Sequence, residues 1–404
     1  MHVSALIARR YLFAKKSMGV INIISMISAA GIAVGCAALV IILSVYNGFD
    51  SVILQLNDSY TADIQITPSS GKVFDAREGS IDALRGDPSV RAFCEVLQEN
   101  VFLQYGDSHQ IASARGVDSL YGSTTLLGDY LVEGKFELTY GEIPQVVMGR
   151  TLARQLGVRS SFVSPLEVYF PSRSARVDVL DPMASLRKVH LHPAGVLSLD
   201  QAFDRKYIFA PIDKLRELLE YEGAEVSSVE LFLTSDALNA KGFVKRDVQK
   251  RIADGLGDGF VVRNKQEQNE MLYRLLRCEK IAIYLILTFI MIIISFNIFS
   301  SLSMLIIEKQ DDIKVLGAMG ADEGFIKGIF VGEGWLISLT GIAAGVVLGL
   351  LVCFLQQAFG FVKMPGNFVV EAYPVVVEWT DVLLSAGIVA AIGYLASALS
   401  HKLL

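Results

Sequence analysis

The strongest constraint on this sequence is a run of about 27 residues, Ile281–Ile307, without a charged side chain. About 20 apolar residues in a helix span the hydrocarbon core of a bilayer, so this run is long enough to cross one. Three similar runs lie at 21–46, 328–358 and 382–400, and Glu333 is the one charge within them. A mean hydropathy of +0.46 also fits a membrane protein. We therefore predict four transmembrane helices.

Basic residues flank these runs unevenly, which predicts how the chain is oriented. Lys363 is the one basic residue in the loop between the last two runs, 359–381. The other basic flanking residues are Arg9, Arg10, Lys15, Lys16, Lys309, Lys314, Lys327 and Lys402. Short loops rich in Lys and Arg stay in the cytoplasm. We therefore expect the N-terminal segment 1–20, the segment 308–327 and the C-terminal end 401–404 in the cytoplasm.

The long polar segment 47–264 has the pattern of a separate α+β domain on the outer side, inserted between the first and second spans. Alternating apolar residues predict strands at 62–67, 90–105, 145–148, 166–170, 207–210 and 228–234. Helical patterns occur at 150–156, 212–221 and 237–256, and Gly157 follows the first of these. The stretch 171–193 has no clean period and reads as a long irregular loop.

Residues 265–280 predict an amphipathic helix that leads into the second span. Leu272, Leu275 and Leu276 share one apolar stripe on it. This stripe either packs under the outer domain or lines a lipid-facing entrance. The first span ends with the apolar residues Ile42, Val45, Tyr46 and Phe49, which we expect at the same depth of the outer leaflet as the start of the second span. The polar residues Asn47 and Asp50 beside them either meet a ligand or cap the helix.

Small residues in the spans predict close helix packing. Gly31 and Gly35 are four residues apart in the first span, and Gly341, Gly345 and Gly349 continue the same spacing in the third. Asn297, in the second span, is expected to form a hydrogen bond to another helix.

Several functions are disfavoured by the composition. The net charge of −6 gives no reason to expect nucleic acid. Cys94 and Cys278 are a possible disulfide pair, but one pair without a spacing pattern predicts no framework. His190 and His192 lack a third nearby ligand, so we expect no metal. No G-x-x-x-x-G-K-[ST] sequence or catalytic constellation is present, so we expect a non-catalytic chain without a cofactor of its own.

Three segments carry a family resemblance. Leu43–Asp50 (LSVYNGFD) looks like the first-helix signature of lipoprotein-releasing permeases, and Gly149–Val158 (GRTLARQLGV) resembles a stretch of their periplasmic domain. Glu308–Ala321 (EKQDDIKVLGAMGA) is similar to the segment that FtsX-like permeases press against an ATPase. The chain thus resembles a LolC/LolE-type permease subunit of the FtsX/MacB-like ABC transporter family. This implies a MacB-like periplasmic domain of the porter and sabre type.

The resemblance also implies a function and partners. Such a subunit lies in the bacterial inner membrane, extracts acylated lipoproteins from its outer leaflet and passes them to a LolA-like periplasmic carrier. A LolD-like ATPase dimer binds the ATP and Mg²⁺. A second permease subunit, either a sister chain or another copy, completes the membrane part.

The resemblance assigns roles to residues as well. The residues expected to couple to the ATPase are Glu308, Lys309, Asp312, Ile313, Leu316 and Gly320. Gly317 departs from the family, where a basic residue is common. The residues expected in a carrier-binding hook are Pro171, Asp181, Pro182 and Met183. An ordinary β-hairpin at that place and a solvated connecting loop at 308–321 are the plainer interpretations.

Two other functions share most of these features. An FtsX-like protein transmits force for signalling and needs no substrate wall. A MacB-like exporter moves small molecules or peptides, but it normally carries its ATPase on the same chain. The LSVYNGFD segment favours lipoprotein release over both. The sequence does not distinguish LolC from LolE or hybrid roles, or name the lipoproteins.

Overall fold

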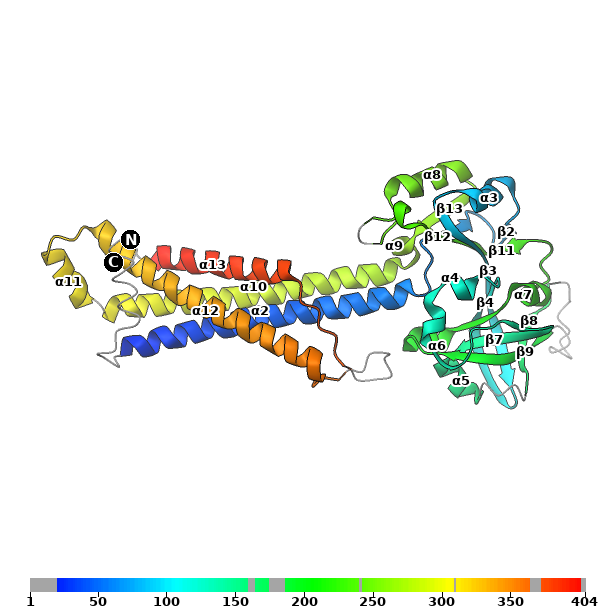
Figure 1. The fold of residues 1–404 in the computed structure, drawn as a ribbon, viewed down its shortest axis with the longest axis horizontal. Helices are drawn as coiled ribbons and strands as arrows, with labels where there is room; N and C mark the ends of the chain where they lie inside the picture. The colour runs from blue at the N-terminus through cyan, green and yellow to red at the C-terminus, as the bar shows by residue number, and fades with distance from the viewer. Residues whose placement is uncertain are drawn as a thin grey trace. The chain divides into compact units, whose positions relative to one another are not determined.

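A computed structural model describes residues 20–158, 164–173, 186–239, 242–308, 310–363 and 372–400. The chain forms two compact units (Figure 1). The described residues of 1–52, 274–364 and 370–404 form the first, which we call the helical unit. The described residues of 53–273 form the second, which we call the sheet unit.

The helical unit is built from five helices in its described residues. They are α2 (Val20–Asp58), α10 (Glu270–Glu308), α11 (Gln310–Ala318), α12 (Glu323–Phe359) and α13 (Trp379–Ser400). All except α11 are long and apolar enough to cross a membrane, which agrees with the four predicted spans. The last turns of α2 and the first residues of α10 belong to the sheet unit.

Helix α2 is longer than expected, and the start of α10 differs slightly from the prediction. We expected α2 to end near Tyr46, but it continues to Asp58 because Ser51–Asp58 contains neither Gly nor Pro. The amphipathic stretch leads directly into the second span as predicted, since both lie in α10, but its first residues form the separate short helix α9 before Asn269.

Glycine contacts hold the helices of the helical unit close together. A Cβ built on Gly345 of α12 would lie 2.7 Å from Cβ of Cys36 on α2. One built on Gly35 of α2 would lie 2.6 Å from Cγ1 of Ile294 on α10. The small-residue faces therefore pack within this chain, as close packing requires. Asn297 packs against Gly31, and its buried Oδ1 accepts no hydrogen bond from the described residues, so the predicted bond to another helix is not made through this oxygen.

The sheet unit contains an eleven-stranded mixed sheet in its described part. Its strands are β1 (Ile64–Pro68), β3 (Val90–Tyr105), β4 (Ser108–Val117), β5 (Leu131–Gly134), β6 (Thr139–Tyr140), β7 (Ile143–Gly149), β8 (Leu166–Pro171), β9 (Leu186–Leu197), β10 (Tyr207–Pro211), β12 (Ser228–Leu233) and β13 (Phe260–Asn264). The order is β13-β1-β12-β3-β4-β10-β7-β9-β5, with β6 beside β7 and β8 beside β3 and β9. β2 (Phe74–Asp75) and β11 (Glu225–Val226) form a separate pair.

Helices cover both faces of this sheet. They are α3 (Gly79–Asp82), α4 (Tyr121–Thr124), α5 (Arg150–Leu156), α6 (Gln201–Lys206), α7 (Ile212–Leu219), α8 (Arg246–Leu256) and α9 (Lys265–Gln268). Alternate residues of one strand enter different cores. Val146 and Met148 of β7 pack with α5, α7 and α8, whereas Val147 packs with α4 and α6.

The predicted elements of this unit are mostly confirmed. Each of the six predicted strands overlaps an observed one, and α5 has the predicted bounds because Gly157 ends it at φ +72°. The helix expected from 237 begins only at Arg246. Before it, Leu238 bridges Val244 and the Asn239 side chain accepts a hydrogen bond from Phe243 N, which favours a turn. Residues 186–193 are strand β9 rather than irregular loop.

Candidate functional site

The first candidate site is α11, the short helix between two spans. Ile313 and Leu316 pack against the core of the helical unit, together with Ala321. Val315 and Met319, the residue directly after α11, are instead exposed over 58% and 71% of their surfaces, and Met319 N donates to Val315 O at 3.1 Å. They are four residues apart and share one helix face. This short helix thus presents an exposed apolar pair, which is suited to binding in a groove of another protein.

The residues that the sequence predicted for ATPase coupling include both inward-facing and exposed positions of this segment. Ile313 and Leu316 are partly buried, and Glu308 and Gly320 are exposed. Lys309 lies outside the described residues, and the structure describes the backbone of Asp312 but not its side chain. Val315 and Met319 were missed, although their spacing of four residues places them on one helix face.

A glycine ends α11 and turns the chain towards α12. Gly320 has φ +89°, Gly320 N donates to Gly317 O at 2.9 Å, and Ala321 N donates to Leu316 O at 3.0 Å. This Schellman-like cap requires a left-handed residue, which glycine adopts without steric cost. Gly320 therefore determines where α11 ends. This role requires no contact between Gly320 and a partner protein.

The second candidate site is the apolar wall predicted on α2 and α10. Ile42, Val45, Tyr46 and Phe49 are all half-buried on α2.

The α10 part of this wall divides between two environments. Leu275 is 56% exposed, whereas Leu276 is only 7% exposed, and Leu272 is half-buried within the sheet unit. In the isolated chain, Leu275 is therefore the most accessible of the three leucines.

A polar strap joins the LSVYNGFD segment to the loop before α13. Asn47 Nδ2 donates to Asp381 Oδ2 at 2.7 Å, and Val376 N donates to Ser44 O at 2.9 Å. A Cβ on Gly48 would lie 2.5 Å from the carbonyl carbon of Pro374, so only glycine fits there. Asn47 and Gly48 thus tie α2 to the start of α13, a role the sequence did not reveal.

The predicted hook lies mostly outside the described residues. Pro171 ends β8 and is exposed, while Asp181, Pro182 and Met183 lie in the part that is not described. β8 and β9 pair antiparallel on either side of this part. His190 Nδ1 lies 3.6 Å from Glu167 Oε1. No group of three or more His, Cys, Asp or Glu side chains suited to a metal occurs in the described residues.

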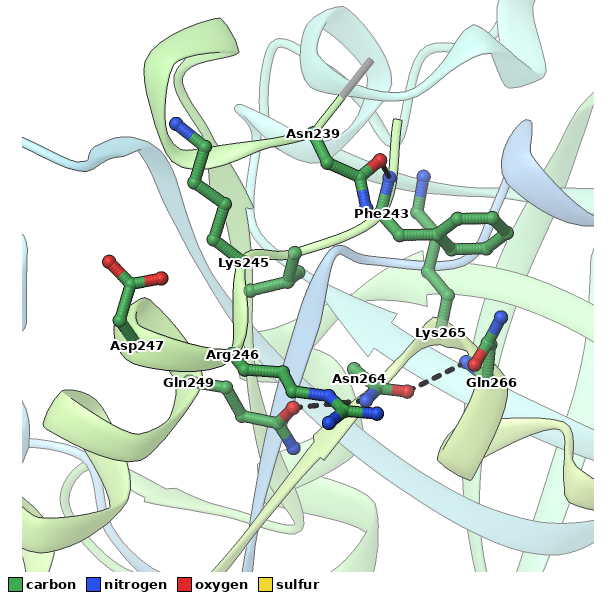
Figure 2. Close-up of a pocket in the computed structure, with 10 residues that line it drawn as sticks. Asn239, Phe243, Lys245, Arg246, Asp247, Gln249, Asn264, Lys265 and Gln266 are labelled. Atoms are coloured by element: carbon green, nitrogen blue, oxygen red, sulfur yellow. Dashed lines mark hydrogen bonds between the residues drawn. The ribbon is translucent and has the colours of Figure 1, made fainter. Parts of the chain in front are cut away.

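A polar cleft of about 440 Å³ lies beside α8 and α9 in the sheet unit (Figure 2). Its polar side chains are largely bonded within the protein: Asn264 Nδ2 donates to Gln249 Oε1 at 3.0 Å and Lys245 Nζ to Asp236 O at 2.6 Å. Lys265 forms ion pairs at its edge. The bonded polar side chains of the cleft therefore stabilise the fold and are not free to bind a ligand.

Charged groups are also buried inside the sheet unit. Arg115 of β4 forms an ion pair with Glu230 of β12, and Tyr121 donates its hydroxyl to the same carboxylate. Burial raises the pKa of Asp204 to about 6, even though Leu199 N donates to it at 3.0 Å. Neither the Arg115–Glu230 pair nor Asp204 lines the cleft beside α8 and α9.

Comparisons with known proteins match this architecture. Residues 284–404 match the family model of the FtsX-like permease C-terminal region, and residues 25–177 match that of the MacB-like periplasmic core domain. The lipoprotein-releasing system transmembrane protein LolC of Xylella fastidiosa is 26% identical over 98% of this chain and 94% of its own length. LolE of Haemophilus influenzae is 23% identical over 95% of this chain and 92% of its own length.

The chain is thus similar to LolC and LolE along nearly its whole length, and its C-terminal region matches the FtsX-like permease family. The matched C-terminal region of this chain contains α11, α12 and α13, so the exposed pair at 315 and 319 lies within the family segment. The crystal structure of the periplasmic region of MacB from Actinobacillus actinomycetemcomitans covers 55% of this chain and 98% of its own, at 13% identity and a TM-score of 0.35.

Proposed function

We propose that this chain is the permease subunit of an ABC transporter that releases lipoproteins from the outer leaflet of the inner membrane. ATP hydrolysis on a separate subunit drives the release, and a periplasmic carrier receives the lipoprotein. The observation that carries this proposal is similarity along nearly the whole chain to permeases named for lipoprotein release.

In this proposal the orientation follows from the basic residues. Both termini and α11 lie in the cytoplasm, and the sheet unit lies in the periplasm between the first two spans. The loop before α13, with Lys363 as its one lysine, lies on the periplasmic side.

The ATPase dimer binds α11 at the cytoplasmic surface. Val315 and Met319 enter an apolar groove of the ATPase, while Glu308 and Lys314 lie beside this pair and orient it. Ile313 and Leu316 pass the movement of α11 to the spans because they pack into the helical core. ATP and Mg²⁺ are bound by the partner and not by this chain.

The acyl chains of the lipoprotein contact the wall on α2 and α10. Ile42, Val45, Tyr46 and Phe49 supply the α2 side, and Leu275 and Leu276 of the same helical unit supply the α10 side. Each buried methylene contributes about 0.8 kcal/mol, so a wall of this kind holds acyl chains without polar contacts. Cytoplasmic ATP binding closes the wall and expels the chains.

Two further partners complete the transporter. α10 exposes an apolar face that includes Leu285, Phe289 and Phe296, each at least 65% exposed. This face contacts membrane lipid or the second permease subunit. The β8–β9 hairpin, with Pro171 and the segment Asp181–Met183, contacts a LolA-like carrier.

The proposal is tested by reconstituting the permease with its ATPase in liposomes that contain a labelled triacylated lipoprotein. We expect ATP-dependent transfer of the lipoprotein to a soluble carrier. A complex with an ATPase variant that cannot hydrolyse ATP is the control and transfers nothing. An intact, ATP-hydrolysing complex that transfers no lipoprotein but exports a small molecule or activates a cell-wall hydrolase contradicts the proposal.

A further inference from the structure

The chain enters and leaves the sheet unit at one place. It enters through Ile53–Asp58, the last turns of α2, and leaves through α9 and the first residues of α10. The next strand after entry, β1, pairs antiparallel with the last strand before exit, β13, and Ile64 lies opposite Asn264. The ends of the two spans are therefore neighbours within the sheet unit.

A lysine bridges these ends. Lys265 Nζ lies 3.3 Å from Asp58 Oδ1 and 3.1 Å from Asp63 Oδ1, and its side chain is only 12% exposed. The other oxygen of Asp63 accepts a hydrogen bond from Leu233 N at 2.7 Å, which fixes it to β12. Salt screens such a shielded pair less than a surface pair. Figure 2 shows Lys265 beside Asn264, at the end of β13.

Amide side chains add a second bridge. Asn269, between α9 and α10, donates its Nδ2 to Asn57 Oδ1 at 2.9 Å, and Asn57 is 3% exposed. Gln268 Nε2 donates to Ala62 O at 2.9 Å. Amide hydrogen bonds are directional, so they fix the orientation of the two ends as well as their distance.

We propose that this polar clasp, made of Asn57, Asp58, Asp63, Lys265 and Asn269, stays closed throughout the transport cycle. It makes α2 and α10 move the sheet unit as one body, so that closure of the spans is transmitted to the periplasmic side. Without the clasp, each span would bend at its own connection and the sheet unit would not follow. Lys265 and Asn269 are thus positioning residues, and this inference rests on the proposed function.

The coupling role is tested in the reconstituted complex by comparing lipoprotein release with ATP hydrolysis. We expect Lys265→Met to keep ATP hydrolysis but to lower release per ATP by about tenfold, as expected for the loss of a coupling contact. Lys265→Arg keeps the charge and should restore most of the release. Lys72→Met is the matched control, because it breaks the Lys72–Glu99 ion pair of the same unit, whose lysine is 74% exposed. Equal release per ATP in Lys265→Met and wild type overturns the proposal.

Covalent locking of the clasp distinguishes a clasp that stays closed from one that must open during the transport cycle. Cysteines at Asn57 and Asn269 are cross-linked with a short thiol reagent in a Cys278→Ser background, because the other native cysteines are buried. We expect release to persist when the clasp is locked. Release that stops on cross-linking, with an unchanged melting temperature, contradicts a clasp that stays closed.

A third measurement does not depend on the substrate. Hydrogen exchange of the amides in 59–63 is followed in the complex with and without ATP. We expect protection in every nucleotide state, and its loss in any state overturns the closed clasp. If protection holds but no lipoprotein is released by the wild type, the proposed function fails and the clasp does not.

Discussion

Alanine at Val315 and Met319 tests whether α11 binds the ATPase. Their exposed fractions are 58% and 71%, so much of each side chain is available for burial by a partner. Full burial of such a side chain is worth about 1.5 to 3 kcal/mol, and scaling by the exposed fractions gives about 2 kcal/mol or more for the pair. A loss of about 2 kcal/mol weakens binding roughly 30-fold.

The assay is binding of the purified ATPase to the permease in nanodiscs, measured by biolayer interferometry. Gln310→Ala, an exposed polar position on the same helix, is the control and should bind within about twofold of wild type because it removes little apolar area. Unaltered affinity of the Val315→Ala/Met319→Ala variant would refute α11 as the apolar docking element. The Kd of the two variants therefore decides the question.

Three further predictions follow from the packing and charges. Gly48→Ala forces a methyl against the Pro374 carbonyl, so the helical unit should lose about 1 to 3 kcal/mol and melt at a lower temperature in detergent; an unchanged melting temperature contradicts the strap. Burial raises the pKa of Asp204 to about 6, so the folded protein favours the protonated carboxyl group. The contribution of Asp204 to the free energy of unfolding is therefore present in acid and falls by about 1 kcal/mol between about pH 5 and pH 7. Asp204→Asn should abolish that fall in urea unfolding followed by circular dichroism. Arg115→Met leaves Glu230 buried without its cation, which should cost about 3 to 5 kcal/mol in the same assay, and Arg115→Met/Glu230→Leu should recover most of it.

Elements with a local signal were predictable from the sequence. The four spans follow from uncharged length, and α5 follows from its apolar spacing and Gly157. The continuation of α2 to Asp58 was missed, although Ser51–Asp58 contains neither Gly nor Pro, and contacts within the sheet unit stabilise its last turns. Strand β9 was missed because the stretch 171–193 shows no clean alternation of apolar residues, although β9 pairs with the preceding strand β8 and with β7.

The candidate site was predictable in position but not in detail. The charged segment between two spans located α11, yet which of its apolar residues point inward depends on the core that Ile313 and Leu316 meet. Asn47 could be recognised as polar at the end of a span, but its partner Asp381 is far away in the sequence. Contacts of this kind depend on the folded arrangement and have no local pattern.

The most direct test of the account is photo-crosslinking from Tyr46, with a photoreactive amino acid in its place, in membranes that contain the ATPase and a labelled triacylated lipoprotein. The same probe at Tyr394, an exposed tyrosine of α13, is the matched control and should give no lipoprotein adduct. We predict an adduct at Tyr46 that disappears when ATP is added. No adduct at Tyr46 or Phe49 in an intact complex would contradict lipoprotein extraction along the wall on α2 and α10.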